Sequence, residues 1–129
     1  MILDTSAIVV VATRESGFRT YAEAMSRAAL CRVSAATFVE FSVVLERQFD
    51  AEIAQQCDAL LHDIGVEVEP VTVEQAYLAC QAFRDFGRGR HAAGLNFGDC
   101  FAYALAKAAG EPLLFKGDDF RRTDVLCAV

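Results

Sequence analysis

The segment Phe97-Gly98-Asp99-Cys100-Phe101-Ala102-Tyr103-Ala104-Leu105-Ala106 is apolar on nearly every side when it is drawn as a helix. Such a pattern is typical of a helix that is buried all round rather than on one face. Asn96 is a good N-cap and Gly110 a typical stop, so we predict a helix over residues 97–109. This buried helix is expected to carry one carboxylate, Asp99, in its first turn.

Short apolar strands alternate with helices along the rest of the chain. Strands are predicted over residues 1–3, 32–34, 66–69, 113–115 and 125–129, and further helices over residues 6–12, 18–29, 35–49, 51–64 and 73–86. This alternation predicts an α/β fold with a mainly parallel sheet covered on both faces. Ligands of such sheets bind beyond the carboxyl ends of the strands. Asp4 and the pair Asp118–Asp119 directly follow predicted strands, which makes them candidates for a site.

Length and composition restrict the class of protein. At 129 residues the chain has the size of a single domain, residues 1–129. It is 54% hydrophobic, yet it has no uninterrupted apolar run of about 18 residues and no basic N-terminal segment. We therefore expect a cytoplasmic protein with no membrane span and no signal peptide. The excess of apolar residues indicates surfaces that other chains cover.

Charge and cysteine content exclude several kinds of site. The formal net charge of −6 argues against a simple basic clamp for nucleic acid. A nuclease stays compatible with that charge, because carboxylates that hold a divalent metal count as negative in the sequence. The five scattered cysteines form no CxxC pair, and with only two histidines they indicate free thiols rather than a zinc site.

Asp4 and Glu40 are the first two candidate acids. Asp4 could simply cap the helix that follows it, although Thr5 and Ser6 could cap that helix equally well. Glu40 has only small or apolar helical neighbours at three and four residues, so we expect it to be largely buried. A buried charge needs a partner or a metal. The alternative for Glu40 is a salt bridge to a remote Arg or Lys.

Asp99 and the Asp118–Asp119 pair complete the acidic set. Asp99 could serve only the helix dipole, and the pair could serve only the turn after Gly117. Phe120 is expected to anchor that turn in the core, which leaves at least one of the two acids facing the site. Acids from four separate elements form a hard-oxygen site that suits Mg²⁺ or Mn²⁺ and not zinc.

The chain resembles PIN-domain ribonucleases of the VapC toxin type. The matching segments are residues 1–7, 34–40, 98–106 and 113–124. The resemblance covers nearly all of the chain and implies a three-layer α/β/α sandwich, Mg²⁺-dependent RNA cleavage, homodimerisation and inhibition by a cognate VapB-type antitoxin. It implies that Asp4, Glu40 and Asp99 are the metal-site acids, with a fourth from Asp118 or Asp119.

Lys116 and Arg121 are candidate RNA contacts, because they flank the last acidic pair. The most basic stretch is the loop Arg84–His91, whose charges could equally be solvated surface charges. Two other functions compete with the ribonuclease. One is an acidic-pocket phosphatase or phosphotransfer domain, which would need an acid where Ser6 stands or at a mid-chain strand end. The other is a PIN-like module that binds a partner without cleaving, against which the full acidic set argues.

Overall fold

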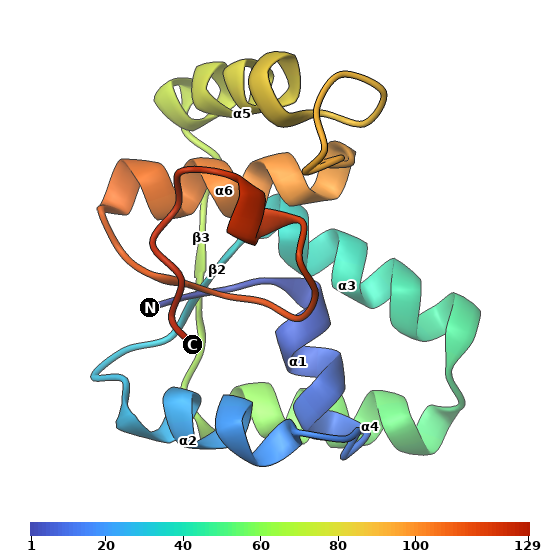
Figure 1. Ribbon diagram of the computed structural model, residues 1–129. Coiled ribbons are helices and arrows are strands. Elements are labelled where there is room, and N and C mark those ends of the chain that lie inside the picture. Colours follow the sequence, from blue (N-terminus) through green and yellow to red (C-terminus); the bar gives the residue numbers. More distant parts are fainter.

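The computed structural model describes residues 1–129 and has three layers, with helices above and below a central sheet (Figure 1). The elements in chain order are β1 (Ile2–Leu3), α1 (Thr5–Ala12), α2 (Phe18–Arg27), β2 (Arg32–Ser34), α3 (Ala35–Gln48), α4 (Ala51–Asp63), β3 (Glu67–Glu69), α5 (Val73–Phe86), α6 (Phe97–Ala109), β4 (Leu113–Leu114) and the 3₁₀ helix η1 (Phe120–Arg122). The predicted α/β sandwich is therefore confirmed.

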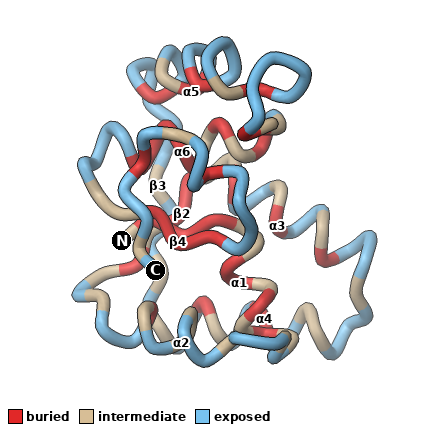
Figure 2. The backbone as a smooth tube through the Cα atoms, in the orientation of Figure 1, coloured by how far each residue is buried: buried red, intermediate tan, exposed pale blue.

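The sheet is parallel throughout and has the strand order β3-β2-β1-β4. Successive side chains of a strand point to opposite faces. Accordingly, Ile2 and Leu113 pack in the core under α5 and α6, whereas Leu3 and Leu114 pack in the core formed with α1 to α4. Figure 2 shows β1 and β4 as buried, whereas the edge strand β3 is largely exposed.

Helix α6 lies between the sheet and α5, as the opening segment of the sequence predicted. Its bounds match the prediction, with Asn96 as N-cap and Gly110 as a left-handed C-cap. Because α5 covers the side that faces away from the sheet, almost every residue from Gly98 to Ala106 is buried. No helix of the structure is both long enough and apolar enough to cross a membrane.

The predicted strand over residues 125–129 is wrong. Cys127 forms one isolated parallel bridge with Leu113, and the amide of Ala128 donates to the Leu113 carbonyl at 3.0 Å. Strand β4 has only two residues, so it offers this tail too short an edge for a ladder. Only Val125 of the segment is buried, and the tail otherwise runs along the surface.

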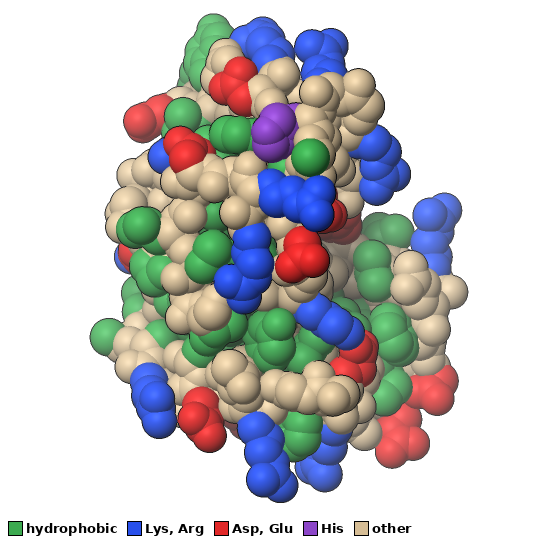
Figure 3. All heavy atoms as spheres, viewed as in Figure 1, with side chains coloured by type: hydrophobic (Ala, Val, Ile, Leu, Met, Phe, Trp, Pro, Cys, Tyr) green, Lys and Arg blue, Asp and Glu red, His purple; other side chains and the backbone are tan.

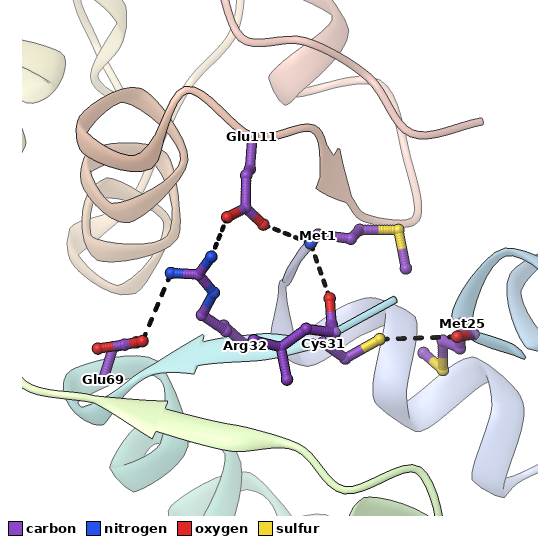
Figure 4. A network of polar contacts seen from close by, with 7 residues as sticks. Met1, Met25, Cys31, Arg32, Glu69 and Glu111 are labelled. Atoms are coloured by element: carbon purple, nitrogen blue, oxygen red, sulfur yellow. Dashed lines mark hydrogen bonds and ion pairs between the residues drawn. The ribbon is translucent and has the colours of Figure 1, made fainter. Parts of the chain in front are cut away.

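A polar network ties the amino end of β1 to its neighbours (Figure 4). The Met1 ammonium donates to the Leu30 carbonyl at 2.9 Å and pairs with the Glu111 carboxylate. Glu111 also pairs with Arg32, which reaches Glu69 at 3.5 Å. The ammonium, and then Arg32, hold the pKa of Glu111 below its ordinary value.

We predict that Glu111→Gln lowers the free energy of unfolding at neutral pH by roughly 1 kcal/mol, because one carboxylate serves two cations. A lowered folded-state pKa contributes stability above the unfolded value of 4.5, and this stability is lost as the pH falls. Urea unfolding at several pH values should therefore show the two proteins converging below about pH 4. An equal difference at pH 3 and pH 7 would contradict the role of the charge.

Candidate functional site

Asp4 begins the site at the carboxyl end of β1. Its side chain is only 5% exposed and is the N-cap of α1, accepting from the Ser6 amide at 3.0 Å and the Ser6 hydroxyl at 2.5 Å. The capping role considered for Asp4 is thus real, and neither Thr5 nor Ser6 replaces it. Both bonds end on Oδ2, so the cap occupies one oxygen of the carboxylate.

Ser6 and Lys116 link the start of α1 to the segment after β4. The Ser6 hydroxyl accepts from the Lys116 amide at 3.0 Å while it donates to Asp4. The Lys116 ammonium pairs with Glu15 and with none of the candidate acids. No local pattern indicated the role of Glu15, because the two partners of this contact are 101 residues apart in the chain.

Glu40 reaches the site from α3 across Gly98. It is half-buried, so the expectation of a largely buried side chain is wrong in degree. A Cβ atom built on Gly98 would lie 2.1 Å from Oε1 of Glu40, so only glycine leaves room for the carboxylate in this position. The Thr5 hydroxyl is buried and has no hydrogen-bond partner. It lies close to Glu40, and its effect is to lower the pKa of that carboxyl group.

Asp99 has both a structural role and a place in the site. In a capping box, its Oδ2 accepts from the Asn96 amide at 2.7 Å, and its own amide donates to the Asn96 side chain at 3.0 Å. This helix-terminal role is the alternative considered from the sequence. It engages one oxygen of Asp99 and leaves the carboxylate beside the cavity that Asp4 and Glu40 also line.

The pKa of each of the three carboxyl groups lies above its ordinary value. Burial raises the pKa of all three; for Glu40 the charges of Asp4 and Asp99 add to this rise. The pKa of Asp99 rises to about 6, through burial first and then through the charges of Asp4 and Asp119, with Arg88 opposing. None of the three forms a salt bridge to Lys or Arg, so the salt-bridge alternative for Glu40 is not realised.

A cavity of about 360 Å³ collects these side chains beyond the carboxyl ends of β1 and β2. Its polar lining consists of Asp4, Thr5, Ser6, Glu15, Glu40, Gln48, Asn96, Asp99 and Lys116. Figure 3 shows acidic and basic side chains beside the recess between α3 and the body of the molecule.

The lining fits a hard divalent cation in its chemistry. No three acidic, His or Cys side chains are close enough together, as they stand, to hold a metal ion. Three carboxylates without a cationic partner, and the space that Gly98 leaves for one of them, supply the oxygen donors that Mg²⁺ or Mn²⁺ requires.

Of the remaining predicted site residues, Lys116 lines this cavity, whereas Asp118, Asp119 and Arg121 do not. Asp118 and Asp119 are exposed on the turn before η1, and only Asp119 acts on the pKa of Asp99. Phe120 is buried, as expected. Arg121 donates to the Val129 carbonyl at 3.0 Å and is directed toward the carboxyl terminus, whereas Lys116 lines the cavity.

Arg88 is a site neighbour that the sequence did not single out. It lies in the predicted basic loop, but only the structure shows that its charge lowers the pKa of Asp99.

Comparisons with known proteins agree on one family. The PIN domain model matches residues 1–126. The chain is 49% identical over 126 residues to ribonuclease VapC42 of Mycobacterium tuberculosis, covering 97% of this chain and 96% of the relative. It is 43% identical over 125 residues to a ribonuclease VapC of Mycolicibacterium smegmatis, covering 97% of each chain.

Solved structures show the same fold at low sequence identity. The crystal structure of Mycobacterium tuberculosis VapC20, a sarcin-ricin loop cleaving toxin, aligns with a TM-score of 0.72 at 16% identity, covering 97% of this chain and 95% of that one. VapBC2 of Rickettsia felis, bound to a DNA fragment from its promoter, aligns with a TM-score of 0.73 at 13% identity, covering 98% and 94%.

We predict that Asp99→Asn leaves the metal-free protein as stable as the original at pH 7.5, or more stable. The asparagine Oδ1 can still accept from the Asn96 amide, while the repulsion is removed. Because the folded-state pKa is raised from 3.8 to about 6, the native state gains from protonation at low pH and loses that stability as the pH rises through 6. The advantage of Asn should therefore disappear below about pH 4.

Thermal melts of both proteins in EDTA across this pH range measure the difference directly. A variant that is less stable than the original at pH 7.5 would show that the charged cap outweighs the repulsion.

Proposed function

This chain belongs to the PIN-domain family and, within it, to the VapC ribonucleases, and we propose that it is a Mg²⁺-dependent endoribonuclease, the toxin of a type II toxin–antitoxin system. The observation that carries this proposal is the cavity in which Asp4, Glu40 and Asp99 meet without a cationic partner. Ribonucleases of this family generally depend on a divalent metal ion.

In the proposed mechanism, water attacks the phosphorus of an RNA phosphodiester beside the three carboxylates, the bond from phosphorus to one sugar oxygen breaks, and that oxygen leaves with a proton from solvent. A divalent cation bound there would stabilise the charge on the phosphate and lower the pKa of the water. Asp4 and Asp99 are assigned to hold it, because their caps fix both side chains at helix N-termini. Glu40, half-buried and free of a cap, either shares in holding the cation or accepts the proton of the water.

The neighbours of this set complete the proposed site. Asp119 is favoured over Asp118 as the fourth acid, because its charge acts on Asp99. Lys116, whose amide is held by Ser6 at the rim of the cavity, is assigned to the RNA phosphate. Arg121 has less support as an RNA contact than Lys116, since Lys116 lines the cavity whereas Arg121 is directed toward the Val129 carbonyl.

The proposed setting follows from the family. Related proteins are described as toxin–antitoxin complexes of the VapBC type, and we assign this chain a cognate VapB-type antitoxin. We also assign it a single domain over residues 1–129, the cytoplasm as its compartment and a homodimeric state. The exposed apolar side chains Phe38, Val39 and Val43 on α3 support contacts with other chains.

Metal dependence is the first test of this proposal. Cleavage of RNA by the purified protein should require Mg²⁺ or Mn²⁺, disappear in EDTA and fail to return with Zn²⁺, because all proposed donors are hard oxygens. Asp99→Asn should abolish cleavage while the protein stays folded. Persistence of cleavage in excess EDTA would exclude the mechanism.

A second test uses the space beside Gly98. In Gly98→Ala the new methyl group must displace the Glu40 carboxylate, so we expect the affinity for Mg²⁺ or Mn²⁺ to fall by about tenfold or more. The metal-free protein should melt at the same or a higher temperature, because alanine favours a helix by roughly 1 kcal/mol over glycine. Calorimetric titration with each ion and melts in EDTA measure the two effects. Unchanged metal affinity would remove Glu40 from the metal site.

A further inference from the structure

A second cavity of about 560 Å³ lies between α5 and α6, on the side of α6 that faces away from the sheet. Its apolar lining includes Phe83, Phe97 and Phe101, and we name it the α5–α6 groove. Phe97 is 78% exposed, and its ring meets that of Phe101 edge to face with centroids 4.9 Å apart. An aromatic side chain therefore stands at the surface in a fixed orientation with much of its area open to solvent.

The rim of the α5–α6 groove is positively charged. Arg84 and Arg90 line it, and the Arg90 guanidinium lies over the Phe83 ring at 5.9 Å from its centroid. Arg88, on the same loop, acts on the charge of Asp99. Two arginines therefore border this groove on a chain with a net charge of −6.

The groove and the acidic cavity share the first turn of α6. Asn96 and Asp99 line the acidic cavity, while Phe97 and Cys100 line the groove. Helical geometry places these two pairs of residues on two sides of one turn, within about 10 Å of each other. A ligand bound at the carboxylates is thus one nucleotide or two away from the exposed Phe97 ring.

We propose that the α5–α6 groove binds an unpaired nucleobase of the RNA substrate, next to the phosphate that is cleaved. The base stacks on Phe97, and Arg84 and Arg90 contact the neighbouring phosphates. Aromatic rings combined with guanidinium groups are the means by which proteins bind single-stranded nucleic acid. This inference rests on the proposed ribonuclease function.

The charge of the rim favours RNA over a protein in the groove. A purely apolar partner would gain nothing from two arginines, whereas a polyanion with flat bases uses both the arginines and the rings. A second copy of this chain, with exposed aromatic side chains of its own and a net charge of −6, is the alternative occupant that the measurements below distinguish from RNA.

The test compares an aromatic with an aliphatic side chain at position 97. Fluorescence anisotropy measures the binding of a labelled random-sequence RNA of about ten nucleotides, at low salt and in EDTA. Phe97→Leu should weaken binding by about tenfold and Phe97→Tyr by less than about twofold, because stacking requires a ring. Tyr77→Leu is the matched control, since Tyr77 is 75% exposed on α5 but does not line the groove, and it should leave binding unchanged.

Charge is tested in the same assay. Arg90→Gln should reduce the slope of log affinity against log salt by about 0.7, the value for one phosphate contact with a single strand. Arg19→Gln, an exposed arginine on α2 at the opposite end of the molecule, should not. Equal affinity of Phe97→Leu and the original protein, or no binding by the original protein, would overturn the proposal.

Two parallel measurements separate this inference from its alternatives. Light scattering shows whether Phe97→Leu dissociates an oligomer; loss of both the oligomer and RNA binding would assign the groove to a second copy instead. Cleavage of total RNA in Mg²⁺ tests the ribonuclease itself. If the original protein and Phe97→Leu cleave alike, only the groove is wrongly assigned, whereas no cleavage by the original protein refutes the proposed function.

Discussion

The cost of ionising Asp4, Glu40 and Asp99 around one cavity is the constraint on which the site depends, because burial raises the pKa of all three and the charges of Asp4 and Asp99 add to the rise for Glu40. The fold offsets this cost with helix caps. Asp4 accepts two hydrogen bonds at the start of α1, and Asp99 accepts one in the capping box of α6. Each cap engages one oxygen of its carboxylate. The hydrogen bonds that begin two helices therefore also hold two like charges at one cavity.

Helix α6 gives this arrangement its rigidity. It is covered by the sheet on one side and by α5 on the other, so its first turn cannot shift without disturbing the core that it shares with them. Gly98 then lets α3 bring Glu40 against that turn. Asp99 and Glu40 come from helices far apart in sequence, and their relative position is set by the absence of a single methyl group.

Local patterns in the sequence predicted most of the fold and all three central acids. The helix over residues 97–109 and the strand over residues 32–34 were predicted to the residue, because apolar periodicity, Asn96 and Gly110 are local signals. The last strand failed because pairing depends on how much edge β4 offers, which is not a local property. For the same reason, the Lys116–Glu15 pair and the direction of Arg121 could be found only in the structure.

Electrostatics also connects the acidic cavity with the arginines beside the α5–α6 groove. RNA approaching the cavity meets three carboxylates that no salt bridge neutralises, so its phosphates are repelled until a cation reverses the local field. The positive charge of the loop after α5 also reduces this repulsion, since Arg88 lowers the pKa of Asp99. Part of the attraction for RNA thus resides in the protein and part in the cation. It follows that cation and RNA strengthen each other's binding, because each reduces the repulsion that the other must overcome.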